Sequence, residues 1–118
     1  MNRMSYLTLR GISVARLLTG FQDWPSVEVV EVHPGGAMAL GGAPVEQVRT
    51  MKKDRAARSN LRSWLGDQDM TELPGDLMQS DHLLAAAAAA LATWRWKDSK
   101  SNWLHAAEPP LHPFDFTC

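Results

Sequence analysis

Three features of the sequence predict an α/β domain that is rich in helix and carries a small sheet. The first is the valine-rich run at residues 27–32, which is typical of a strand. The second is the helical spacing of apolar residues on both sides of that run. The third is the alanine-rich stretch at residues 83–92, because alanine is the best helix former. A length of 118 residues is ordinary for one domain, so we expect a single domain over residues 1–118.

The first expected helix covers residues 7–18. Its apolar positions repeat at i, i+4, i+7 and i+11, at Leu7, Gly11, Val14 and Leu18. Gly20 is expected to end this helix, since glycine is favoured just past a helix C-terminus.

A strand is expected at residues 27–32. Val29 and Val30 are adjacent, so both faces of this strand carry apolar groups, as in α/β proteins whose sheets are covered on both sides. The segment His33-Pro34-Gly35-Gly36 is expected to be a turn that ends the strand, because proline cannot donate to the ladder. An alternative interpretation as a phosphate-binding loop lacks the spacing and the lysine of a P-loop.

Two helices are expected between residues 43 and 66. The first opens at Ala43-Pro44, because proline is favoured at the first helical position. The second covers residues 54–65, where one face is apolar at Ala57, Leu61, Trp64 and Leu65. Gly66 is expected to end the second helix, and a polar loop follows to Gln79.

A long helix is expected from Ser80 to about Trp96. Ser80 is a favourable N-cap, and Asp81 places a negative charge in the first turn, where the helix dipole stabilises it. Beyond this helix, three prolines predict an extended tail at residues 108–118.

Only one strand is clear from the pattern, and a lone strand cannot satisfy its own backbone groups. Either the chain contains a further strand, for which residues 111–116 are the candidate, or a second copy of the chain supplies the neighbour.

Charge and cysteine content narrow the functional classes. The formal net charge is −1, so the whole molecule exerts no strong attraction on nucleic acid or anionic lipid. Cys118 is the single cysteine, which excludes an intramolecular disulfide and fits a reducing compartment. The longest apolar run, at residues 83–92, is about half the length of a membrane span. We therefore expect a cytoplasmic protein without a membrane partner.

Three segments, taken in order, resemble a known family. They are Leu7-Thr8-Leu9-Arg10-Gly11-Ile12, the run from Glu28 through Val32-His33-Pro34 to Ala37, and Ser80-Asp81-His82 with the alanines that follow. They resemble the uncharacterised family of predicted nucleases with a ribonuclease-H-like fold. That family shows a Leu-Thr-x-Arg-Gly segment, a strand that ends Glu-Val-(Tyr/His)-Pro, and an acidic helix start. The resemblance implies a partial ribonuclease-H-like domain, corresponding to the later half of that fold, whose small sheet dimerisation completes.

The family's chemistry implies carboxylates around divalent metal ions. Such nucleases would hold two Mg²⁺ or Mn²⁺ ions about 4 Å apart between several carboxylates. Glu31 and Asp81 match two acidic positions of the family, whereas Ala85 stands where the family has an aspartate. The aspartate of the family's first strand has no counterpart before Leu7. The resemblance therefore implies that nuclease catalysis is lost, with Glu31 and Asp81 as the remaining catalytic candidates, and no cofactor is expected.

One group of residues is a candidate metal site, consisting of Glu31, His33, Asp81 and His82. The alternative is structural: Glu31 accepts a hydrogen bond at the strand end, Asp81 stabilises the helix start, and the histidines are polar surface. The sequence alone leaves both interpretations open.

A basic segment is the candidate for contact with nucleic acid. Arg55, Arg58 and Arg62 lie at i, i+3 and i+7 of the helix expected at residues 54–65, opposite its apolar face. The alternative is the solvated side of an ordinary amphipathic helix.

Three tryptophans, Trp94, Trp96 and Trp103, are candidates for an interface, because aromatic side chains commonly fill a partner's pockets. Trp94 and Trp96 are two residues apart on a helix and point in different directions, one toward the core and the other toward an interface.

Together these observations predict a non-catalytic remnant of a ribonuclease-H-like protein that acts as a binding or assembly module and forms a homodimer. One alternative is a metal-dependent nuclease, using Mg²⁺ or Mn²⁺, whose site is completed at a dimer interface. A second alternative is a nucleic-acid-binding module.

Overall fold

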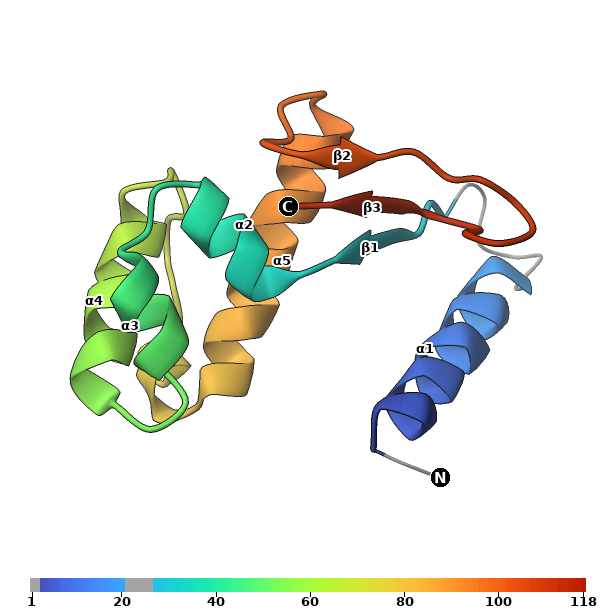
Figure 1. Cartoon of the computed structure of the whole chain (residues 1–118). Coiled ribbons are helices and arrows are strands. Elements are labelled where there is room, and N and C mark those ends of the chain that lie inside the picture. Colours follow the sequence, from blue (N-terminus) through green and yellow to red (C-terminus); the bar gives the residue numbers. More distant parts are fainter. Residues whose placement is uncertain (1–2, 21–26) are drawn as a thin grey trace.

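The computed structural model describes residues 3–20 and 27–118, with side chains from residue 9 onward. This part of the chain is α/β and rich in helix, with a small mixed sheet. The elements follow in the order α1 (Arg3–Gly20), β1 (Val30–Val32), α2 (Pro34–Leu40), α3 (Val45–Thr50), α4 (Arg55–Gly66), a 3₁₀ turn η1 (Leu77–Gln79), α5 (Asp81–Lys97), β2 (Leu104–His105) and β3 (Asp115–Thr117). Figure 1 shows α2, α3 and α4 on one side of α5 and the sheet beside its C-terminal half.

The sheet has the strand order β1-β3-β2. β1 pairs with β3 in parallel, with Glu31 opposite Phe116, and β2 pairs with β3 antiparallel, with His105 opposite Phe116. The neighbour of β1 is therefore a strand of the same chain, which confirms the first of the two alternatives for this strand. The segment expected as an extended tail at residues 108–118 contains β3, the central strand.

The strand expected at residues 27–32 begins only at Val30. Its partner β3 is three residues long, so residues 27–29 have no ladder to join despite their β-branched side chains. Strand length is set here by the partner and not by local preference.

The turn expected at His33-Pro34-Gly35-Gly36 is instead the start of helix α2. Pro34 occupies the first turn, where its missing N–H is not needed. His33 is the N-cap, and its Nδ1 accepts a hydrogen bond of 2.8 Å from the backbone N–H of Gly36. An imidazole acting as N-cap is why the turn prediction was wrong, because histidine is not among the usual capping residues.

The core lies between α2, α4 and α5. It is built from Met38 of α2, Leu61 and Leu65 of α4, and Leu84, Ala88 and Leu91 of α5, with Ala43 and Leu77. The helix expected at residues 54–65 is confirmed as α4, and its predicted apolar face is the face that packs into the core. Asp54 caps this helix, because its carboxylate accepts a 2.8 Å hydrogen bond from the N–H of Ala56.

The long helix α5 is confirmed together with its predicted cap. Ser80 Oγ accepts a 3.1 Å hydrogen bond from the N–H of His82, and the helix runs one residue beyond Trp96.

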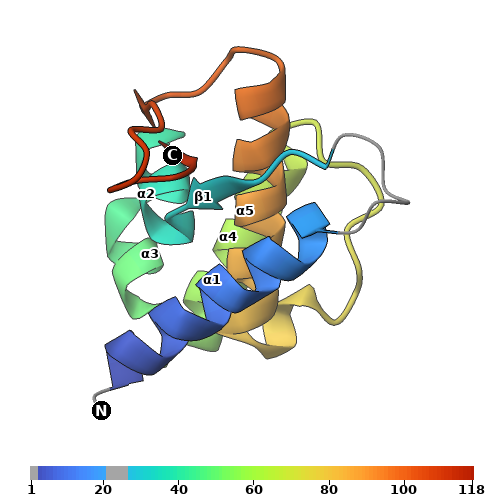
Figure 2. The ribbon, with the colours of Figure 1, turned by 90° about the vertical axis from the view of Figure 1, so that its right-hand side faces the viewer.

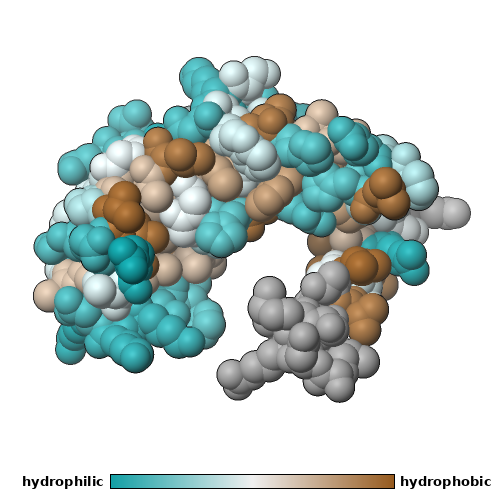
Figure 3. Space-filling model, in the orientation of Figure 1, coloured by the Kyte–Doolittle hydropathy of each residue, from teal (hydrophilic) through white to brown (hydrophobic). Residues whose placement is uncertain are grey.

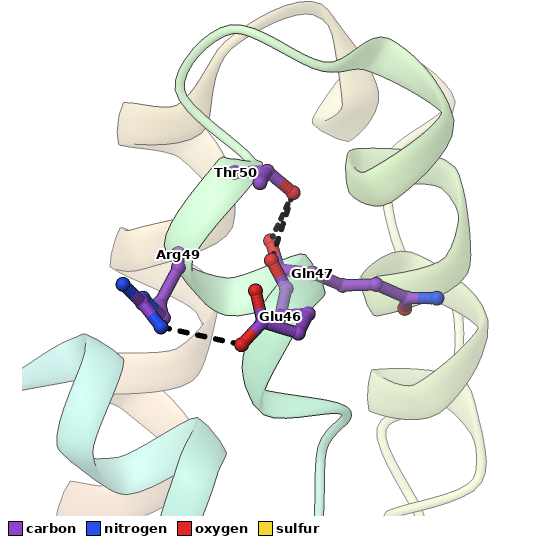
Figure 4. Close-up of polar contacts among 4 residues, drawn as sticks. All are labelled: Glu46, Gln47, Arg49 and Thr50. Carbon is purple, nitrogen blue, oxygen red and sulfur yellow. Dashed lines mark hydrogen bonds and ion pairs between the residues drawn. The ribbon is translucent and has the colours of Figure 1, made fainter.

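Helix α3 has one polar face and one face toward α4. Figure 4 shows the polar contacts of this helix. Arg49 donates to the carboxylate of Glu46 at 3.2 Å, and the Thr50 hydroxyl donates to the carbonyl of Glu46 at 2.8 Å. Gln47 points away from these residues toward the neighbouring helix, and its Oε1 is buried without a hydrogen-bond partner.

Helix α1 stands apart from the rest of the molecule. It contains the helix expected at residues 7–18 and ends at the predicted Gly20. The side chain of Leu7 lies outside the described residues. None of the α1 side chains that the structure describes belongs to the core cluster, although Ala15 is buried. Figure 1 shows α1 as a separate arm beyond the start of β1, and in the turned view of Figure 2 this helix lies in front of the helical body.

Candidate functional site

The four residues predicted as a metal site are divided between two ends of the molecule. Asp81 and His82 lie in the first turn of α5. Trp96, fifteen residues later and about 22 Å along the same helix, is the residue that contacts the sheet through Asp115. Glu31 pairs with Phe116 in the sheet, so the two side chains lie on the same face. Asp115 precedes Phe116 and points to the opposite face, toward α5.

His33 Nδ1 already accepts a hydrogen bond from the N–H of Gly36 as the N-cap of α2. Within residues 9–20 and 27–118, no three His, Cys, Asp or Glu side chains form a group that could hold a metal ion. The structure therefore does not bring Glu31, His33, Asp81 and His82 together as one cluster.

Two of the three arginines predicted to contact nucleic acid bind the chain itself. Arg58 donates to the carbonyl oxygens of Met51 and Met78, at 2.7 and 2.8 Å. Arg62 donates to the carbonyl of Leu73 at 3.1 Å. Both side chains are partly buried and attach α4 to the loop that leads to α5, whereas Arg55 is exposed.

The three predicted interface tryptophans lie in different surroundings. Trp94 is 52% exposed and Trp103 is 45% exposed. Trp96 is half-buried and donates its Nε1–H to Asp115 at 2.8 Å. The two tryptophans of α5 therefore do point in different directions, with Trp96 directed to the sheet and Trp94 to solvent.

Asp115 is the best-connected carboxylate described by the structure, and the sequence pattern did not indicate it. Its Oδ1 accepts a 2.9 Å hydrogen bond from the N–H of Ala107 and its Oδ2 accepts one from Trp96. The bond from Ala107, then that from Trp96, and the nearby charge of His112 hold the pKa of Asp115 below its ordinary value. Asp115 lies in the segment considered both as an extended tail and as a candidate strand, and neither interpretation assigned a partner to its carboxylate.

A pocket of about 420 Å³ lies beside Asp115. It is lined by Glu28, Trp96, Lys97, Ser99, Ser101, Leu104 and Asp115. Lys97 and Glu28 form an ion pair, and both oxygens of Asp115 are already occupied. The polar groups of this pocket thus serve mainly to join α5 to the sheet.

The opposite face of the sheet carries an aromatic cluster of Trp103, His105, His112 and Phe116. His105 and Trp103 are two residues apart, as expected for side chains on one face of a strand. That alternation was the only sequence signal for β2, and the two-residue length of the strand made it too short to recognise.

Among the described residues, none of the helices combines the length and the apolar composition that a membrane-spanning segment needs.

Comparison with known proteins identifies the family. No curated protein and no solved structure shows a significant match to the chain. A protein-family model described as "Protein of unknown function (DUF429)" matches residues 11–109. The match extends from within α1, through the core helices, to the segment after β2. The chain therefore belongs to the DUF429 family.

Proposed function

We propose that this chain is a cytoplasmic assembly module of ribonuclease-H-like descent that works as a homodimer. The observation that carries the proposal is a pair of apolar surfaces that one copy leaves exposed. One surface is helix α1 and the other is the outer face of α5.

Helix α1 carries exposed apolar side chains and lies outside the core cluster. Leu9, Val14 and Leu17 are 52%, 55% and 61% exposed. Helices gain most of their stability from packing an apolar face on other elements, so a helix of this composition needs a partner surface. Exposed apolar side chains gathered on one element are typical of an interaction site.

The outer face of α5 has the complementary property. Leu84, Ala88 and Leu91 turn into the core, yet the helix is apolar on the other side as well. Its exposed positions at i, i+3, i+7 and i+11 are Leu83, Ala86, Ala90 and Trp94. The alanines between a leucine and a tryptophan leave room for another helix to approach closely.

The two surfaces do not cover each other within one copy. Figure 3 shows the molecule hollowed between the helical body and the arm that carries α1. In a symmetric dimer, α1 of each copy would pack on α5 of the other, and both apolar surfaces would be buried by the same contact made twice. A second copy of this chain is therefore the partner that the exposed surfaces of α1 and α5 favour.

The alternatives have less support. Glu31 and Asp81 do not meet in one copy, which leaves a nuclease site to be completed by a partner. Arg58 and Arg62 are engaged with backbone carbonyls, which leaves Arg55 as the exposed arginine of the predicted nucleic-acid face.

The test is light scattering after size exclusion at micromolar concentration. The wild-type chain is expected to be a dimer, and Leu17→Glu and Ala90→Glu are expected to be monomers, because each places a charge in the α1–α5 contact. Leu111→Glu is the matched control, since Leu111 is 91% exposed on a different part of the surface. A monomeric wild-type chain, or equal behaviour of all three variants, would refute the proposal.

A second measurement separates assembly from catalysis. Mg²⁺ or Mn²⁺ raises the melting temperature only if the folded dimer contains a site for it. We expect no shift with either ion. A shift that Glu31→Gln abolishes would favour the nuclease alternative.

A further inference from the structure

Strand β2 and the segment that joins it to β3 each carry one histidine, and the two lie side by side. The ring centre of His112 lies 5.3 Å from that of His105, with the ring planes inclined by 46°. Trp103 stacks on His105 at 6.3 Å, and Phe116 lies 6.3 Å from His112. The two imidazoles are thus held against a wall of aromatic rings on the sheet face that carries Phe116.

The backbone fixes each histidine independently. His105 lies in β2, paired with Phe116 of β3. His112 exchanges two backbone hydrogen bonds with Glu108, in which the Glu108 N–H donates at 2.7 Å and the His112 N–H donates at 3.0 Å. Main-chain hydrogen bonds thus fix the backbone of each histidine, and the two rings are in contact with each other.

The Nε2 atom of His112 is buried and has no hydrogen-bond partner in the described part of the chain. A buried polar atom of this kind is unfavourable unless a water molecule or an ion occupies its lone pair. His105 is exposed, so solutes reach its ring from solvent.

We propose that His105 and His112 bind one Zn²⁺ ion. Imidazole nitrogen is a preferred ligand of zinc. An ion about 2.1 Å from each nitrogen lies about 3.2 Å from each ring centre, so tetrahedral coordination puts the two centres about 5.2 Å apart. The observed separation is 5.3 Å. No third His, Cys, Asp or Glu of the described residues joins this pair, so water completes the coordination.

This site is separate from the proposed dimer contact, because none of its residues belongs to α1 or α5. It also differs from the group Glu31, His33, Asp81 and His82, with which it shares no residue.

The test is Zn²⁺ titration of the full-length chain by isothermal titration calorimetry. The wild-type chain is expected to bind one ion per copy, and His105→Gln and His112→Gln are each expected to weaken binding at least tenfold. His82→Gln is the matched control, because His82 is an exposed histidine on α5. Unchanged affinity in both cluster variants would overturn the proposal, as would an equal loss in the control.

A second readout guards against variants that misfold. The chain has four histidines, so its imidazole proton signals can be resolved by NMR. Substoichiometric Cu²⁺ is expected to broaden the signals of His105 and His112 in the wild-type chain before those of His33 and His82. Uniform broadening of all four signals would contradict a specific site, whatever the folding of the variants.

Discussion

Gly36 lies where the C-terminal residue packs against helix α2. A Cβ atom at this position would lie 2.8 Å from Cys118 Sγ and 3.2 Å from His33 Nδ1. The absence of a side chain therefore lets β3 end against the start of α2, and it keeps the His33 cap in place.

We expect Gly36→Ala to lower the free energy of unfolding by about 1 kcal/mol, because the new methyl displaces Cys118 Sγ while alanine favours the helix over glycine. Urea denaturation measures the loss. The double variant Gly36→Ala/Cys118→Ala is expected to recover most of it, because the closest atom is then gone. If the double variant is no more stable than the single one, the obstacle is His33 and not Cys118.

Asp115 determines how the contact between α5 and the sheet responds to acid. Its pKa is lowered in the folded chain from the ordinary 3.8, first by the hydrogen bond from Ala107 and then by that from Trp96. A carboxyl group with a lowered pKa stabilises the fold above its unfolded pKa, and this contribution is lost as the pH falls through the folded pKa.

The stability of the wild-type chain is therefore expected to fall as the pH drops below 3.8, in part through Asp115. Asp115→Asn keeps a hydrogen-bond acceptor but removes the titration, so its melting temperature should depend less on pH between about pH 5 and about pH 2. If the melting temperatures of the two proteins change with pH in parallel, Asp115 makes no such contribution.

At the scale of elements, the basic face of α4 acts as a tether. Arg58 donates to the backbone carbonyls of Met51, after α3, and Met78, in η1, and Arg62 donates to the carbonyl of Leu73. The contacts with Leu73 and Met78 fix the loop at residues 67–79, which carries little regular structure of its own.

Arg58→Met is expected to lower the free energy of unfolding by about 2 kcal/mol, because hydrogen bonds from a charged group are lost while an unbranched apolar stem is kept. Hydrogen exchange should show faster opening of residues 67–79. Arg55→Ala is the control and should change stability by less than about 0.5 kcal/mol, as for an exposed position. Equal effects of the two substitutions would argue against a tether.

The helices were predictable because their signals are local. Ser80 and its cap, the apolar face at Leu61 and Leu65, and the stop at Gly66 all depend on residues within a few positions of each other. The strands were harder to predict, because β2 and β3 have only two and three residues and β3 lies among prolines. Helix α2 was missed because a histidine caps it.

At the scale of the whole molecule, the exposed apolar surfaces of α1 and α5 predict that stability depends on concentration. If folding and dimerisation are coupled, the melting temperature rises with chain concentration by mass action. Differential scanning calorimetry over a wide concentration range is expected to show this rise for the wild-type chain and not for Leu17→Glu. A concentration-independent melting temperature in both proteins would mean that α1 does not take part in assembly.

The sequence by itself determined the helix-rich α/β class, the positions of α4 and α5, and the Ser80 cap of α5, because helix periodicity and capping are properties of neighbouring residues. It also named the residues that were candidates for each kind of site. Only the tertiary structure decided which residues meet. It placed β3 beside β1 across more than eighty residues of chain, joined Trp96 to Asp115, used Arg58 and Arg62 as tethers, and set His105 beside His112. Such pairings depend on backbone hydrogen bonds and packing between distant segments, for which a sequence pattern carries no local signal.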